Sequence, residues 1–496
     1  MSDSSEKASS DVGVGEALQS PLPVVKRNPF RSTFFNITIL GVACFLSPGL
    51  WGATAALGAG GTQSPQLVNA SNSATFSLMV VTGLLTPALV RLTSIKTALI
   101  IGTTGYAPYA ATLYSKSYYG DKANWSIPFG ASLCGISAGI FWAAEGAIAL
   151  TYPEPKNRGR YLSYWLSFRV MGQFVGGAIL LGLNAQANTA GSVSKSTYLV
   201  LVILQALAPF VAALISPPEK VQRSDGSPVL LRMHSSLRAE IKNTWKTLTT
   251  PRVLLVLPFM WQGTFSESLI GTYAADNFTV RSRALGSLLS AVVGALGVIV
   301  LGLFLDWRKW SLNTRSKAGF LTIATMQAGW WIFAVVIMNR YNRIKPTYDW
   351  VDGPWSSGFA LYLLLQLGFN LQYEFMYFII GGFGNGHEQV VRLASILRAT
   401  ESAGQAVSYG INSTSLRLDA VAGINFALFA LSVVPVWFVV RRIGFAADGV
   451  TKLYEPPVYA EPEERAQLAA QGVEGALGHD ASGKPVPVAD ENLQRA

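Results

Sequence analysis

The sequence contains little charge for its length. Only 13% of the 496 residues are Asp, Glu, Lys or Arg, while 50% are hydrophobic. An ordinary soluble domain is about 25% charged. A soluble chain of this length would form about three domains, and these charges are too few to cover their surfaces. The composition therefore excludes a soluble multidomain enzyme and predicts that lipid surrounds much of the chain.

Cysteines and catalytic motifs are also scarce. The two cysteines, Cys44 and Cys134, each lie in an apolar run and cannot build a disulfide framework or a metal cluster. The GGFGNG stretch at residues 381–386 lacks the Lys-Ser/Thr ending of a phosphate-binding loop, so we interpret it as a turn. Metal-binding His/Asp clusters and nucleophile motifs are absent as well. We therefore expect no enzymatic activity, no cofactor and no metal.

The net charge of +10 could indicate a nucleic-acid partner, but its distribution argues against one. The Lys and Arg residues fall in short loops between apolar runs, which is a signal of membrane topology. We expect the lipid bilayer as a partner and no nucleic acid.

Long apolar segments dominate the middle of the chain. A membrane-spanning helix needs roughly 20 mostly apolar residues. Applying this length predicts an all-α membrane protein with twelve spans, at 34–58, 68–90, 97–113, 125–150, 162–184, 197–215, 253–275, 284–305, 319–338, 357–381, 391–411 and 421–440. The eleventh of these is the most polar, because it contains two arginines and a glutamate.

The spacing of these spans predicts two six-helix halves. The first half covers residues 34–215 and the second covers 253–442, with a polar, basic loop at 216–252 between them. Residues 1–33 and 443–496 are polar, and we expect both segments to be disordered.

Loop charges and glycosylation sequons predict the orientation. Placing both termini in the cytoplasm puts most of the 38 Lys and Arg residues on the cytoplasmic side, as the positive-inside rule requires. The sequons that lie outside the spans or beside their ends then fall on the outer side. We therefore treat four asparagines as possible glycosylation sites: Asn69, Asn124, Asn277 and Asn412.

Charged residues within the spans are candidate functional residues, because a charge at mid-bilayer is costly and usually faces a bundle interior or a wet cavity. Glu145 precedes Arg169 by the same number of residues as Glu374 precedes Arg398. In each half the glutamate lies on the fourth span and the arginine on the fifth, at similar depths. The repeated spacing is typical of a duplicated six-helix unit, and we predict direct contacts of Glu145 with Arg169 and of Glu374 with Arg398.

The roles of these charges remain open from sequence alone. The two pairs could stabilise the hairpin of spans four and five, or one arginine could leave its partner and bind an anionic substrate. Glu401 lies one helical turn after Arg398, which favours a second partner for that arginine. Glu267 in the seventh span could be a substrate or proton site, or a neutral hydrogen-bonded glutamate.

Several motifs resemble the major facilitator superfamily, in particular its fungal uncoordinated-93-like branch. They are FLSPGLWG at 45–52, LGAGG at 57–61, GYAPY at 105–109, WAAEGA at 142–147 and RGRY at 158–161. The superfamily has an acidic residue in the loop between spans two and three. The sequence here, GLLTPALVRL at 83–92, has none, whereas its counterpart in the second half keeps Asp306.

This resemblance implies two alternative functions. Most members of the superfamily are secondary transporters that move small solutes by alternating access. The uncoordinated-93 branch is associated instead with regulating ion channels or escorting other membrane proteins. The partner would accordingly be an unknown small-molecule solute or another membrane protein, and both alternatives stay open at this point.

Overall fold

A computed structural model describes residues 28–62, 64–153, 158–189, 191–224, 229, 237–381, 383, 387–446, 449–454, 476–479 and 485–488. The expected disorder of residues 1–27 lies outside this described part, as does that of most of the C-terminal tail. Within it, the protein is almost entirely helical.

The first half contains six spans, some of them built from two consecutive helices. They are α1 (Thr33–Cys44) with α2 (Leu50–Ala56), α3 (Pro65–Leu92), α4 (Ile95–Thr103) with α5 (Tyr106–Tyr119), α6 (Ser126–Thr151), α7 (Arg158–Asn184), and α8 (Lys195–Ala206) with α9 (Ala208–Ala212). Short turns of 3-10 helix occur at Pro29–Arg31, Ala59–Gly61, Gly120–Ala123 and Pro218–Lys220.

The second half repeats this plan. Its spans are α11 (Pro251–Gly263) with α12 (Ser266–Asn277), α13 (Val280–Leu305), α14 (Leu312–Ile344), α15 (Trp355–Gly381), α16 (His387–Asn412) and α17 (Leu418–Val440). The described residues therefore contain the twelve predicted spans, including the polar eleventh. Eight helical segments are long and apolar enough to cross a membrane by length and composition: Thr33–Ala56, Ser126–Ala149, Tyr164–Asn184, Lys195–Ala212, Pro251–Asn277, Val280–Leu305, Leu312–Ile344 and Leu418–Val440.

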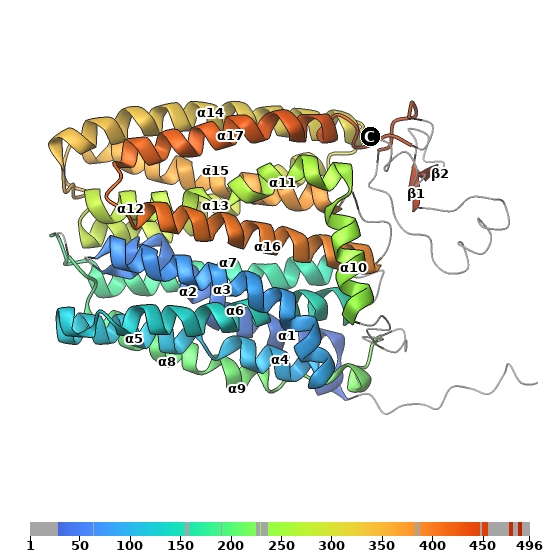
Figure 1. Cartoon of the computed structure of the whole chain (residues 1–496), viewed down its shortest axis with the longest axis horizontal. Coiled ribbons are helices and arrows are strands. Elements are labelled where there is room, and N and C mark those ends of the chain that lie inside the picture. Colours follow the sequence, from blue (N-terminus) through green and yellow to red (C-terminus); the bar gives the residue numbers. More distant parts are fainter. Residues whose placement is uncertain are drawn as a thin grey trace, which may run out of the picture.

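The spans run roughly side by side, with the first half and the second half in separate groups (Figure 1). We call the end of the bundle where α1 begins and α17 ends the terminal end, and the other end the far end. Helix α3 packs along α16, and α7 packs along α13, so these two contacts join the halves. The largest cluster of buried apolar side chains lies within the second half, and two further clusters lie mainly within the first.

Three segments expected to be loop or disordered contain structure. In the central loop, α10 (Leu237–Leu248) contacts α16 and α11 and runs across the spans (Figure 1). Next to the first span, the Gln222 backbone N–H donates to the Arg31 carbonyl at 2.8 Å. In the C-terminal segment, Leu453 is buried and exchanges backbone hydrogen bonds with α14 and Gly444. Further along the tail, β1 (Ala476–His479) pairs antiparallel with β2 (Pro485–Val488).

The first span is interrupted where its sequence cannot sustain a regular helix. Pro48 lies in a five-residue π-helical turn, Phe45–Gly49, between α1 and α2. Proline has no backbone N–H to donate, and its ring collides with the preceding turn. The wider π turn accommodates the proline ring and the missing N–H, so the span continues through this position. The interruption lies beside the cavity described below, whose wall includes Pro48 and Gly49.

Close backbone contact between the halves at the far end depends on Gly58. This residue has φ +75°, and a Cβ atom built there would lie 2.0 Å from the Gly271 carbonyl oxygen of α12. Positive φ is readily available only to glycine, and a new side chain would also push the halves apart.

We therefore expect Gly58→Ala to lower the stability of the protein by about 1–3 kcal/mol, which is the usual range for overpacking. The thermal unfolding midpoint of the purified protein would measure this. Gly302→Ala is the matched control, because a Cβ atom there meets nothing within 4 Å. Equal midpoints for the two variants would contradict the proposed close contact.

A polar contact joins two connections at the far end. Asp349, in the loop between α14 and α15, accepts hydrogen bonds from Arg281 Nε at 2.8 Å and from Thr279 Oγ1 at 2.7 Å. The Arg281 guanidinium holds the pKa of this carboxyl at about 2, below its ordinary value. The charged form of Asp349 therefore stabilises the folded state.

The pH dependence follows from the lowered pKa of Asp349. Its contribution is fully present above the unfolded pKa of about 3.9 and is lost as the pH falls through about 2. We expect Asp349→Asn to lower the unfolding midpoint by a few degrees at pH 7. The difference from the unmodified protein should disappear near pH 2. Asp121→Asn, which removes an exposed ion pair with Lys116, should change little at either pH.

Candidate functional site

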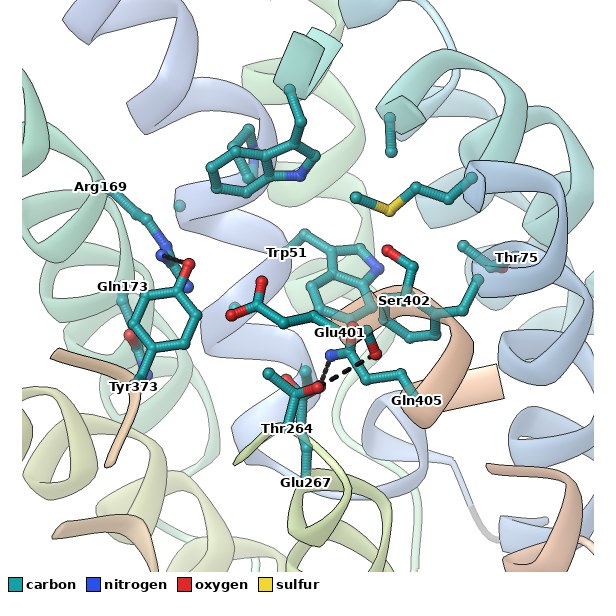
Figure 2. A pocket seen from close by; sticks show the side chains of 18 of the residues that line it. Trp51, Thr75, Arg169, Gln173, Thr264, Glu267, Tyr373, Glu401, Ser402 and Gln405 are labelled. Atoms are coloured by element: carbon teal, nitrogen blue, oxygen red, sulfur yellow. Dashed lines mark hydrogen bonds between the residues drawn. The ribbon is translucent and has the colours of Figure 1, made fainter. Parts of the chain in front are cut away.

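A cavity of about 110 Å³ lies between the two halves. Its wall includes residues of α2, α3, α5, α6 and α7 from the first half, and of α12, α15 and α16 from the second. For comparison, a buried cavity of about 150 Å³ is large enough for benzene. Figure 2 shows charged, amide and aromatic side chains facing one another across this space. The cavity is therefore polar and located where both halves can act on its contents.

Two arginines from different halves meet at the wall of the cavity. Arg169 of α7 lies over the rings of Trp142 and Tyr373, with 5.3 Å from its Cζ atom to each ring centroid. Arg398 of α16 lies over the same two rings, at 4.1 Å and 5.4 Å. Because Trp142 belongs to the first half and Tyr373 to the second, each arginine contacts an aromatic ring of the other half. We call Trp142, Arg169, Tyr373 and Arg398 the arginine–aromatic cluster.

The direct contacts predicted between Glu145 and Arg169 and between Glu374 and Arg398 are not formed. Among the described residues, the Glu145 carboxylate accepts a hydrogen bond from Trp165 Nε1 at 2.6 Å, and no ion pair joins it to Arg169. Arg169 instead donates to the Tyr373 hydroxyl at 3.3 Å. The Glu145 and Arg169 side chains therefore have different partners.

Arg398 has an acidic partner on its own helix. It donates to the Glu401 carboxylate at 3.2 Å, one helical turn away. Glu401 is buried, and its backbone carbonyl accepts a hydrogen bond from Thr264 Oγ1 at the break between α11 and α12. Glu374 does not line the cavity and makes no hydrogen bond or ion pair within the described part of the chain. The structure therefore pairs Arg398 with Glu401 rather than with Glu374.

Glu267, in the first turn of α12, lines the cavity. Its carboxylate accepts a hydrogen bond from Gln405 Nε2 of α16 at 2.5 Å (Figure 2). The break after α11 positions this glutamate, because α12 starts anew at Ser266 beside the cavity. The arrangement is compatible with both sequence interpretations, a binding site and a hydrogen-bonded buried glutamate.

Reasoning from charge alone missed several residues of the site. Trp51, Trp142, Tyr373 and Gln405 are uncharged, so a search for charges within the spans does not find them, although Trp51 and Trp142 lie in two of the family-like motifs. The sequence signal that could have indicated these residues was the presence of arginines within membrane spans, where a charge is energetically costly. Such a cation needs carboxylates, carbonyls or aromatic faces as partners, and the sequence offers few carboxylates.

Three of the four possible glycosylation sites are buried. Asn69 Nδ2 donates to Thr272 Oγ1 and to the Asn412 carbonyl, and Asn412 Nδ2 donates to Ser268 Oγ. Asn277 Nδ2 donates to the Tyr273 carbonyl. A glycan on any of these nitrogens would displace the packing around it, which argues against their use. Asn124 is half-buried and accepts from Lys116 Nζ, and its glycosylation stays a prediction.

Comparison with known proteins identifies the family. The family described as "Ion channel regulatory protein UNC-93" matches residues 69–339, which is more than half of the chain. The chain belongs to the UNC-93 family. This UNC-93 member is 40% identical to the "Notoamide biosynthesis cluster protein O'" of Aspergillus versicolor, over 94% of this chain and 99% of that one. It is also 26% identical to UNC93-like protein 1 of Arabidopsis thaliana, over 87% and 95% of the two chains.

Solved structures establish the fold of the UNC-93 member. The crystal structure of a D-xylose–proton symporter aligns with 81% of this chain and 97% of its own, with a TM-score of 0.59 and 12% identity. A nucleoside transporter aligns over 81% and 99%, with a TM-score of 0.54 and 11% identity. These matches confirm the predicted major facilitator fold. The protein is an integral, multi-pass membrane protein of that type.

The hydrogen bond between Trp165 and Glu145 can be tested by Trp165→Phe, which removes the N–H donor but keeps an aromatic ring. We expect a loss of about 1–3 kcal/mol in stability, because a buried carboxylate loses a donor. The additional change Glu145→Leu should restore part of this loss. Trp331→Phe is the matched control, because the buried Trp331 N–H has no hydrogen-bond partner among the described residues. Thermal unfolding of these three variants and of the unmodified protein would decide, and equal losses for Trp165→Phe and Trp331→Phe would count against the assignment.

Proposed function

We propose that this protein is a secondary transporter that moves a small polar solute by alternating access, with both termini and the central loop in the cytoplasm. The observation that carries this proposal is the polar cavity between the halves, lined by charged side chains from both. In this mechanism a solute held between two halves is exposed first to one side of the membrane and then to the other.

The contacts at the far end support two alternating arrangements of the halves. Arg283 of α13 donates to the carbonyls of Leu57 and Gly58, each at 2.8 Å, and to that of Gly191 at 3.0 Å. Tyr362 of α15 donates to the Ala56 carbonyl at 2.9 Å. These hydrogen bonds close the far end across the interface between the halves. With the termini in the cytoplasm, the far end is the outer end, so the structure corresponds to a state closed to the outside.

Unsatisfied hydrogen-bonding capacity in the cavity indicates a polar solute. Among the described residues, Arg169 makes a single side-chain hydrogen bond, to a phenol, although its guanidinium carries five N–H donors. Glu267 and Gln405 on the second half can accept and donate toward the same space. A solute with an acceptor group for Arg169 would therefore contact both halves at once. The Aspergillus versicolor relative is named for a biosynthesis cluster, and small organic compounds are the first solutes to test.

The test is transport by the purified protein in liposomes, with organic acids, sugars and nucleosides, in the presence and absence of a proton gradient. We expect at least one class to be transported. For that solute, Arg169→Lys should lower the rate about tenfold or more while the protein stays folded, because lysine lacks the planar fork of arginine.

Arg417→Lys is the control for Arg169→Lys, since Arg417 is exposed and pairs with Asp419 at 2.8 Å away from the cavity. It should transport at the unmodified rate. Absence of transport for the whole panel, with folded protein shown by its unfolding transition, would overturn the proposal.

The family description supports a second candidate, a regulator of an ion channel or an escort of another membrane protein. The absence of an acidic residue at 83–92, where transporters of this fold have one, also favours it. Affinity capture from native membranes would then return one stable membrane-protein partner, and Arg169→Lys would leave that association unchanged. Affinity capture that returns no stable membrane-protein partner would count against this candidate.

A further inference from the structure

Helix α10 is oriented differently from the membrane spans. Figure 1 shows it running across the spans near the terminal end of the bundle, where it contacts α16 and α11. Its twelve residues make a rod about 18 Å long at 1.5 Å per residue. A helix that crosses the spans near one end of the bundle lies along the plane of the membrane, at the level of the lipid headgroups.

One face of α10 is held by the protein and the other is exposed. Leu248 packs against the apolar core of the second half, and Asn243, Thr244 and Thr247 are half-buried. On the exposed face, Ile241 and Trp245 lie one helical turn apart and expose 62% and 65% of their surface. Without a further partner, water would cover these two large apolar side chains, which is unfavourable. Their exposure therefore needs an explanation.

Basic residues flank this apolar pair. Arg238, Lys242 and Lys246 are all exposed, and their helical spacing places them beside Ile241 and Trp245. Glu240 is the only acidic residue of the helix. An apolar strip bordered by cations is the pattern of a helix that inserts its apolar side chains between acyl chains and holds lipid phosphates with its charges. Tryptophan is also enriched at this depth of a bilayer.

We infer that the exposed face of α10, formed by Arg238, Ile241, Lys242, Trp245 and Lys246, docks on the anionic surface of the surrounding bilayer. The positive charge of this face of α10 argues for anionic lipid as its partner, because three cations on one helix favour phosphate-rich, negatively charged lipid over a neutral surface. Each cation near such a surface strengthens binding about fivefold, so the three together favour the docked state by roughly a hundredfold. This inference does not depend on transport.

Docking would fix the central loop relative to the membrane. The loop joins the two halves, and α10 contacts α16, the helix that carries Arg398 and Glu401. Membrane charge would therefore act on the second half close to the cavity helix. A neutral bilayer would bind the cations of α10 more weakly than an anionic bilayer.

The experiment uses the full chain, reconstituted into bilayer discs of phosphatidylcholine alone or with phosphatidylserine. An environment-sensitive fluorophore is attached at Ile241→Cys, in a background where the buried Cys44 and Cys134 are changed to Ala. Quenching by brominated lipid reports contact with acyl chains, and quenching by iodide reports contact with water. We expect phosphatidylserine to increase quenching by brominated lipid and to decrease quenching by iodide.

Two triple variants separate local docking from total charge. Removing the cations of α10 (R238Q, K242Q and K246Q) should abolish the response to phosphatidylserine, a loss of roughly a hundredfold in the ratio of docked to undocked helix. Removing three exposed cations elsewhere at the terminal end (K309Q, R441Q and R442Q) should leave it intact.

Three outcomes would overturn the inference. The first is iodide quenching that is unchanged by phosphatidylserine. The second is an equal response in both triple variants, which would show an effect of net charge only. The third is a fluorophore protected from both quenchers in every disc, which would place another segment of the chain on this face.

Discussion

Two cations held on the same pair of aromatic rings constrain the interface between the halves. Arg169 and Arg398 both lie over Trp142 and Tyr373, so two like charges share one site within a membrane domain. Their repulsion is offset by the negative faces of the rings and by the Glu401 carboxylate. Because each arginine contacts a ring of the other half, the cluster is complete only while the halves lie together at this level. Separating them would expose an arginine that has no carboxylate partner.

The interruptions of the helices serve this central region. The π turn at Phe45–Gly49 and the break at Thr264 both adjoin the cavity, and at the break the Thr264 hydroxyl donates to the Glu401 carbonyl of α16. The far end is different, because it is joined by backbone carbonyls of α2 that accept hydrogen bonds from Arg283 and Tyr362. Its contacts are directional and individually modest. The apolar cores, in contrast, lie mainly within the separate halves, although one cluster also includes Val280, Ala284 and Tyr409 of the second half.

Much of the fold, but less of the site, followed from the sequence. The lengths of the apolar runs predicted all twelve spans, since the bilayer thickness sets helix length directly. The equal spacing predicted direct contacts of Glu145 with Arg169 and of Glu374 with Arg398, and these contacts are not formed. It could not give the direction in which each side chain points, because that depends on the rotation of each helix about its axis. The burial of Asn69, Asn277 and Asn412 argues against glycosylation at these sequons, and a short motif carries no information about burial.

The difference between the two halves is explained by the residues around each charge. The spacing that relates Glu145 to Glu374 makes Ala394 the counterpart of Trp165. Glu374 therefore has no indole N–H at that position from which to accept a hydrogen bond. At the same spacing, Glu401 corresponds to Gly172, where a Cβ atom would lie 2.9 Å from the Gly49 Cα atom. The contact between α7 and the π turn therefore leaves no room for a carboxylate at Gly172, the position that corresponds to Glu401. Within the described part of the chain, Arg169 therefore has no acidic partner, whereas Arg398 has Glu401. Arg169 is held instead by its hydrogen bond to Tyr373 and by the rings of Trp142 and Tyr373, at the wall of the cavity between the halves.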